Sequence, residues 1–190
     1  MLYSIQDIAH IISAQWLQAS TPEAGIEHLL FDSRQVAAPD RSLFFALSGE
    51  RQDGHHYLAD LYKAGVRNFV VGKPLQVSDF PDANILQVSD TLQALQALAQ
   101  HHRRRFHIPV VGITGSNGKT ICKEWLYQLL NEDFNIVRNP KSFNSQIGVP
   151  ISVWNMTADN TLGLFEAGIS EPDEMLRLQK VIQPTIGLIT

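Results

Sequence analysis

The sequence of 190 residues predicts an α/β protein in two parts. A small N-terminal α/β domain is expected over residues 1–85, and part of a doubly wound domain with a mainly parallel sheet is expected over 86–190. Short apolar runs alternate with segments of helical periodicity, which is the order that produces a parallel sheet. The break at Pro81-Asp82 divides the two parts. A glycine-rich run at 112–120 separates a predicted strand from a predicted helix.

Composition is that of an ordinary folded protein and excludes several classes. The chain has 44% hydrophobic residues and a formal charge of −4, which rules out a disordered tail or a coiled coil and argues against nucleic acid as a partner. No window approaches the roughly 18 apolar residues of a membrane span. The single cysteine, Cys122, fits a reducing cytoplasm. The end of the chain at 186–190 reads as a buried strand, which favours a fragment of a longer protein.

In the first part, Ser4 is expected to cap a helix. Its apolar face is formed by residues close to helical spacing, Ile5, Ile8, Ile12 and Trp16. The remaining elements expected here are strands over 26–31 and 43–47, a helix over 57–64 that ends at Gly65, and a strand over 69–71.

In the second part, an expected helix over 92–106 is capped by Asp90 or Thr91. The apolar run 110–114 does not alternate with polar residues, as expected of a strand buried on both faces. The elements that follow are a helix over 119–130, a strand over 134–137, a helix over 147–154, a strand over 162–165, a helix over 172–181 and a strand over 186–189. The three tryptophans are expected in the core: Trp16, Trp125 and Trp154.

A basic run, His101 to Arg105, lies at the C-terminal end of the helix expected over 92–106. It could form a nucleic-acid patch, but cations at a helix C-terminus complement the helix dipole, so we interpret it as a solvated helix end. A second polar group, Asp53 with His55 and His56, contains good metal ligands. No second cluster supports a metal there, which favours a role in a substrate loop.

The strongest motif is the glycine-rich run between the strand at 110–114 and the helix at 119–130. Glycines let the backbone point its N–H groups at a phosphate, and the helix N-terminus adds partial positive charge. Ile113 stands where the strict P-loop pattern has its first glycine, and the alternative is a chance match in a surface turn. We therefore predict an ATP-binding P-loop formed by Gly115, Ser116, Asn117, Gly118, Lys119 and Thr120.

An acidic residue, Glu166, follows the buried strand over 162–165. The C-terminal ends of strands in a doubly wound sheet face the ligand crevice. Glu166 is therefore expected to bind Mg²⁺ together with the Thr120 hydroxyl, while Lys119 reaches the β- and γ-phosphates. The alternative is a surface glutamate at the end of a strand.

Several runs resemble those of the Mur ligases of peptidoglycan synthesis. The order of these runs along the chain is more specific than the P-loop alone. The similar runs are Asp32-Ser33-Arg34, the segment 43–49, Asp53-Gly54-His55, the segment 112–120, the segment 144–150 and Glu166-Ala167-Gly168.

The resemblance implies an ATP-dependent, ADP-forming amide ligase. Within the family the chain most resembles the branch that joins D-Ala-D-Ala to UDP-N-acetylmuramoyl-tripeptide through an acyl phosphate, including members fused to an alanine racemase. The resemblance implies catalytic roles for Lys119, Asn144 and Glu166. It places the UDP-sugar peptide on the first domain, at Ser33, Arg34, Asp53, Gly54 and His55. It implies neither a nucleic acid nor a membrane as partner and leaves the oligomeric state open.

The chain departs from the family pattern at Ser145, where a second asparagine is usual. The resemblance also implies that the rest of the ATP-binding domain and a C-terminal domain follow residue 190, so this chain alone is expected to be inactive. One alternative is a related ligase that adds an earlier stem-peptide residue. A folylpolyglutamate synthase is disfavoured by the Asp32-Ser33-Arg34 and Asp53-Gly54-His55 runs. A non-catalytic nucleotide-binding module remains a further alternative.

Overall fold

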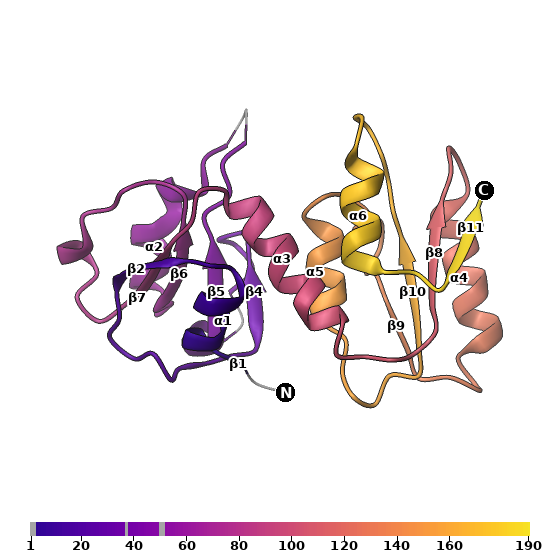
Figure 1. Cartoon of the computed structure of the whole chain (residues 1–190), viewed down its shortest axis with the longest axis horizontal. Helices are drawn as coiled ribbons and strands as arrows, with labels where there is room; N and C mark the ends of the chain where they lie inside the picture. The colour runs from indigo at the N-terminus through magenta and orange to yellow at the C-terminus, as the bar shows by residue number, and fades with distance from the viewer. Residues whose placement is uncertain (1–2, 37, 50–51) are drawn as a thin grey trace. The chain divides into compact units, whose positions relative to one another are not determined.

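The computed structural model describes residues 3–36, 38–49 and 52–190. The chain divides into two compact units, Met1–Leu98 and Ala99–Thr190, each with its own sheet (Figure 1). The sequence placed the division at 85/86, which is too early. A strand over Asn84–Gln87 pairs with the strand over Asn68–Val71 and therefore belongs to the first sheet.

The first unit follows the predicted order with some added strands. Ser4 caps the first helix as expected, and it forms a capping box with Asp7. The elements are β1 (Tyr3–Ser4), α1 (Ile5–Ile11), β2 (Gln15–Gln18), β3 (Gly25–Ile26), β4 (His28–Leu30), β5 (Ser42–Phe45), α2 (Leu58–Lys63), β6 (Asn68–Val71) and β7 (Asn84–Gln87).

The main sheet of this unit has the order β2-β7-β6-β5-β4. β4 to β7 run parallel, and only β2 is antiparallel to its neighbour. Every residue of β5 and β6 is buried, as expected of parallel strands covered on both faces. β1 and β3 form a separate two-stranded ribbon.

The first helix is shorter than its apolar pattern predicted. It ends at Ile11, and Ser13 adopts a left-handed conformation with φ 51°. The chain therefore turns, and Trp16 lies in β2 opposite Leu86 instead of on the helix. Trp16 is only partly buried there.

The second unit begins within α3 (Thr91–Arg103), which Asp90 caps through hydrogen bonds from the backbone N–H groups of Leu92 and Gln93. Its other elements are β8 (Val110–Thr114), α4 (Lys119–Leu130), β9 (Ile136–Arg138), α5 (Gly148–Trp154), β10 (Leu162–Glu166), α6 (Glu174–Ile182) and β11 (Ile186–Ile189). The segment 147–154 is helical from Gly148 onward, as predicted from the sequence.

Four parallel strands form the second sheet, in the order β11-β8-β10-β9. Neighbouring residues of β8 point to opposite faces. Val110 packs with apolar residues of α5 and α6, whereas Val111 and Ile113 pack with residues of α4. Helices therefore cover both faces, which confirms the doubly wound fold.

Apolar side chains are exposed at the β11 edge and along α4. Ile189 is 84% exposed, and Trp125 is 65% exposed, so the expectation of a core position for this tryptophan is wrong. Trp125 lies between Ile121 and Leu129 at successive helical turns, on the face of α4 away from the sheet. No helix of the described residues is long and apolar enough to span a membrane.

The basic run 101–105 is only partly solvated, which corrects the interpretation of a solvated helix end. His102 and Arg103 are buried. The Arg103 guanidinium donates to the carbonyl oxygens of Ile182, Phe106 and Gln183, so it ties the end of α3 to the end of α6. The run is therefore partly structural.

We predict that His102 makes the stability of the second unit depend on pH. Burial lowers the pKa of its imidazole from the usual value of about 6.5 to about 4. As pH falls from about 6.5 towards 4, the unfolded chain binds a proton that the folded chain does not, and about 3 kcal/mol of stability is lost. Urea unfolding at pH 7 and pH 4.5 should show this loss. It should shrink in His102→Gln and persist in the exposed control His101→Gln; equal losses in both variants would contradict the assignment.

Candidate nucleotide and substrate sites

The P-loop connects β8 to α4, as the sequence predicted. Gly115 and Gly118 have φ values of 136° and 79°, a region that residues with a side chain rarely adopt. The Lys119 Nζ folds back over the loop and donates to the Gly115 carbonyl oxygen at 2.6 Å. Thr120 follows in the first turn of α4 and is half-buried. The loop therefore has the backbone shape and the two side chains that a phosphate site needs.

Gly115 is also required by a close approach of the backbone. A Cβ atom at this position would lie 2.1 Å from the carbonyl oxygen of Thr190. Thr190 donates its backbone N–H to the Thr114 carbonyl at 2.9 Å and its hydroxyl to the Asn117 carbonyl at 2.5 Å. The end of β11 and the P-loop thus lie against each other.

Glu166 ends β10, next to β8 in the sheet, with Ile113 as its register partner. It is fully buried, so the alternative of a surface glutamate is wrong. Both carboxylate oxygens lack a hydrogen-bond partner among the described residues. An unbonded buried carboxylate is costly, and such groups in native proteins generally have a functional reason.

The backbone of Glu166 is held by the buried side chain of Asn139. The Asn139 Oδ1 accepts from the Glu166 N–H at 2.7 Å, and its Nδ2 donates to the Phe143 carbonyl at 2.6 Å. Asn139 therefore joins the end of β10 to the loop that follows β9. The hydrogen bonds leave the carboxylate of Glu166 free to meet a ligand.

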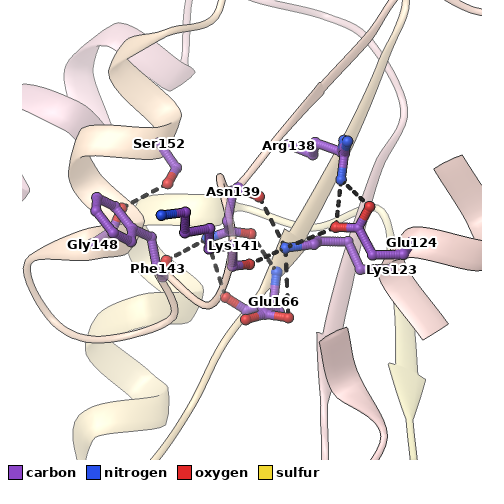
Figure 2. Close-up of polar contacts among 9 residues, drawn as sticks. All are labelled: Lys123, Glu124, Arg138, Asn139, Lys141, Phe143, Gly148, Ser152 and Glu166. Atoms are coloured by element: carbon purple, nitrogen blue, oxygen red, sulfur yellow. Dashed lines mark hydrogen bonds and ion pairs between the residues drawn. The ribbon is translucent and has the colours of Figure 1, made fainter. Parts of the chain in front are cut away.

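A cation within ion-pair distance of Glu166 is Lys123, which the sequence did not single out as a site residue. Figure 2 shows its ammonium between the two acids, 3.7 Å from Glu166 Oε2 and 3.6 Å from Glu124 Oε1. Glu124 is in turn paired with Arg138, whose guanidinium lies over the Tyr127 ring. A chain of ion pairs thus runs from Arg138 through Glu124 and Lys123 to Glu166, with positive and negative side chains in alternation.

Asn144 lies close to the residues after Glu166. Its main-chain carbonyl accepts from the Gly168 N–H at 2.8 Å, and a Cβ on Gly168 would lie 3.0 Å from the Asn144 side chain. The glycine of the Glu166-Ala167-Gly168 run therefore makes room for Asn144. Ser145, at the position where the family usually has asparagine, accepts the Gly148 N–H at the start of α5.

In the first unit, Asp53 and His55 form one hydrogen-bonded turn. The His55 Nε2 accepts from the Gly72 N–H at 3.0 Å, which places the ring proton on Nδ1, and Nδ1 donates to Asp53 Oδ1 at 2.6 Å. Lys73 donates to the other Asp53 oxygen, and with His55 it lowers the pKa of that carboxyl. Because both ring nitrogens are used, these residues shape the turn.

Gly54 lies inside the same turn, against the residues that follow β5. Its N–H donates to the Leu47 carbonyl at 2.8 Å, and a Cβ here would lie 2.8 Å from the Leu47 nitrogen. Only glycine fits this approach, so Gly54 has a structural reason to be present.

The Asp32-Ser33-Arg34 run follows β4. Arg34 forms a bidentate pair with Asp32, at 2.8 and 2.7 Å, which lowers the pKa of that carboxyl to about 2. The Arg34 side chain is nevertheless 86% exposed. A guanidinium that is oriented by a carboxylate yet open to solvent can bind an anionic group. Ser33 is half-buried beside it.

The structure thus brings Lys119, Thr120 and Glu166 to neighbouring strand ends of the second unit, and Asn144 next to Gly168. The predicted substrate residues all lie in the first unit, in two loops that follow β4 and β5. Sequence reasoning missed Lys123 and Asn139. Lys123 could have been noticed because it lies one helical turn after Lys119, on the same side of α4.

Comparison with known proteins places both units in one family. Residues 25–103 match the model "Mur ligase family, catalytic domain", and residues 113–190 match the Mur ligase middle domain. Two relatives are UDP-N-acetylmuramoyl-tripeptide–D-alanyl-D-alanine ligases. The ligase from Synechocystis sp. is 34% identical, and the match covers 87% of this chain and 36% of the relative. The ligase from Treponema pallidum is 31% identical, and the match covers 100% of this chain and 43% of the relative.

Solved structures agree with the sequence relatives. A crystal structure of MurF from Acinetobacter baumannii superposes with a TM-score of 0.90 and 26% identity, covering 100% of this chain and 41% of that one. MurF from Thermotoga maritima in complex with ADP gives a TM-score of 0.73 and 28% identity, covering 86% and 37%. The chain spans about two fifths of the length of these relatives. The two matched regions follow each other along the chain and together include most of its residues, so the chain belongs to the Mur ligase family.

Proposed function

We propose that this chain forms the UDP-sugar-binding and nucleotide-binding parts of a cytoplasmic ligase that joins D-Ala-D-Ala to UDP-N-acetylmuramoyl-tripeptide, with ATP converted to ADP. The similarity to ligases of that name supports the substrates. The single observation that supports the nucleotide site most is the buried carboxylate of Glu166, on the strand next to the P-loop strand. Its oxygens accept no hydrogen bond from the part of the chain that the structure describes.

The residues present fit a magnesium ion. Mg²⁺ prefers oxygen ligands and is usually held by one or two carboxylates together with substrate phosphates. Glu166 offers two oxygens without hydrogen bonds among the described residues, and Thr120 offers a hydroxyl at the start of α4. When bound, the ion would neutralise charge on the phosphates.

The chain's own residues would mainly position and neutralise charge, as in other phosphoryl transfers. The loop N–H groups and the α4 N-terminus would hold the phosphates, and Lys119 would exchange its bond with Gly115 for a bond with them. We propose that Asn144 donates a hydrogen bond near the γ-phosphate and the carboxylate that receives it. The amine of D-Ala-D-Ala would then attack the carbonyl carbon of the resulting acyl phosphate, so that the C–N bond forms as the C–O bond to phosphate breaks and inorganic phosphate leaves.

The first unit would bind the UDP-sugar peptide through its two loops. We assign direct contact to Ser33 and the exposed Arg34, and we assign shaping of the neighbouring turn to Asp53, Gly54 and His55. We also propose that this chain alone does not ligate, because the relatives it matches are more than twice as long. Without the remaining parts, the acceptor amine lacks the positioning that such reactions need.

Calorimetric titration tests the assignment of ligands. The full-length protein should bind ADP with Mg²⁺, and it should bind UDP-N-acetylmuramoyl-tripeptide more tightly than UDP-N-acetylmuramate with shorter peptides. Preference for a shorter peptide would instead favour a ligase that adds an earlier residue. Binding of neither nucleotide nor UDP-sugar would contradict the proposal.

We predict that Arg34→Ala weakens binding of the UDP-sugar tripeptide by about 10-fold or more, because a hydrogen bond to a charged group contributes roughly 1.5–3 kcal/mol. Arg41→Ala is a matched control, since Arg41 is another partly exposed arginine of the same unit paired with a carboxylate, Glu27. Affinity that is equal in the two variants would remove Arg34 from the site.

A further inference from the structure

Lys123 is a fully buried lysine on the nucleotide side of α4. It lies four residues after Lys119, so the two ammonium groups leave the helix on the same side, one turn apart. A buried lysine is rare unless it is paired, because removing an ammonium from water is costly. Its position therefore needs a reason beyond the packing of the helix.

Two main-chain carbonyls anchor the Lys123 ammonium. It donates to the Asn139 carbonyl at 2.9 Å and to the Lys141 carbonyl, both in the loop after β9 (Figure 2). An ammonium has three donors. Two are used by the loop, so the group is fixed and its charge stays 3.7 Å from Glu166 Oε2.

The distance matters as much as the charge. At 3.7 Å the ammonium attracts the Glu166 carboxylate electrostatically but is too far for a hydrogen bond, so the carboxylate oxygens keep their lone pairs. The other nearby acid, Glu124, is already paired with Arg138. The cluster thus supplies Glu166 with a compensating positive charge without using its ligand atoms.

We propose that Lys123 is the positioning residue of Glu166. It fixes the carboxylate at the end of β10 so that an oxygen is available to the metal of a metal–nucleotide complex. This inference rests on the proposed nucleotide site, and it adds a residue that contacts neither nucleotide nor metal. Asn139 contributes to the same arrangement. Its side chain accepts a hydrogen bond from the backbone N–H of Glu166, and its main-chain carbonyl accepts one from Lys123.

The test measures how much Mg²⁺ tightens ADP binding. Calorimetric titrations of the full-length protein with ADP are run in Mg²⁺ and in EDTA. Lys123→Gln keeps donors for the carbonyls but loses the charge, so affinity in Mg²⁺ should fall about 10-fold or more, in the range typical of residues that orient metal ligands. Affinity in EDTA should stay unchanged, because the P-loop is intact. Lys123→Arg restores the charge and should recover most of the Mg²⁺ effect.

The controls separate the two levels of the proposal. Lys180→Gln, at an exposed position of α6, should behave as wild type. If the wild-type protein shows no Mg²⁺-dependent ADP binding, the proposed nucleotide site fails. If the wild-type protein does bind ADP more tightly in Mg²⁺, the inference about Lys123 can be tested separately. It is overturned if Lys123→Gln keeps the full Mg²⁺ effect, or if Lys123→Gln loses ADP affinity equally in Mg²⁺ and in EDTA.

A structure of the wild-type protein with Mg²⁺ and ADP provides a second test that needs no variant. Glu166 should contact the ion, directly or through one water, while Lys123 keeps its bonds to Asn139 and Lys141. Lys123 displaced from the carboxylate, or Glu166 turned away from the ion, would overturn the inference even if Lys123→Gln failed to fold.

Discussion

Lys119→Ala should abolish ligation by the full-length protein while leaving it folded. The loss of one group that stabilises charge in the transition state typically costs about 10²–10³ in kcat, and the P-loop lysine also helps to bind the nucleotide. Among the described residues, Lys119 makes a single side-chain hydrogen bond, to the Gly115 carbonyl. Its loss should therefore reduce stability by only about 1 kcal/mol.

Phosphate release with all three substrates measures the activity of this variant, and a thermal melt measures its fold. Lys180→Ala, on the exposed side of α6, provides the matched control and should retain activity. Near-normal turnover of Lys119→Ala would show that the loop is not the ATP site. A variant that does not fold would show that Lys119 has a structural role.

Glu166→Gln should reduce ligation by about 100-fold or more and raise the Mg²⁺ concentration that the reaction needs. An amide is a poorer ligand for Mg²⁺ than a carboxylate, and charge neutralisation by the metal contributes several kcal/mol to such reactions. The side chain keeps its size. The hydrogen bonds between Glu166 and the Asn139 side chain use only the main-chain atoms of Glu166, so the fold should be retained.

A magnesium titration of the reaction rate tests this variant. The control is Glu132→Gln, which removes an exposed carboxylate from the turn after α4 and should leave the titration unchanged. If Glu166→Gln gave the wild-type magnesium dependence, Glu166 would not be a ligand, and its burial without hydrogen bonds would need another explanation.

The features that sequence could predict are local ones. The caps at Ser4 and Asp90 depend on residues within three positions of them. The strand–loop–helix of the P-loop depends on a contiguous run from 110 to 130. The position of Glu166 follows from one rule about the ends of parallel strands. In each case the information lies in a single short segment.

The errors arise where the outcome depends on distant partners or on one backbone angle. The apolar spacing of α1 continues to Trp16, but the left-handed Ser13 stops the helix. The sequence did not predict β7 because this short strand begins and ends with polar residues, Asn84 and Gln87. Pairing with β6 and β2 stabilises it in the fold.

Buried charged side chains are the second kind of feature that the sequence did not predict. Lys123 looks like a solvent-facing residue of a helix, and its burial depends on two carbonyls of a loop 16 and 18 residues later. Arg103 is similar, because its partners at Ile182 and Gln183 are about 80 residues away. The helical spacing from Lys119 indicates the side of α4 on which Lys123 lies, but it does not identify the loop carbonyls that bind its ammonium. Only the folded arrangement identifies those partners and the partners of Arg103.

The most direct test of the proposed ligase is a complete reaction with defined products. The full-length protein is supplied with ATP, Mg²⁺, UDP-N-acetylmuramoyl-tripeptide and D-Ala-D-Ala, and products are measured by mass spectrometry together with phosphate release. We predict the UDP-N-acetylmuramoyl-pentapeptide, with one ADP and one phosphate formed per amide bond. Absence of the pentapeptide, or its formation without ATP turnover, would contradict the proposed function.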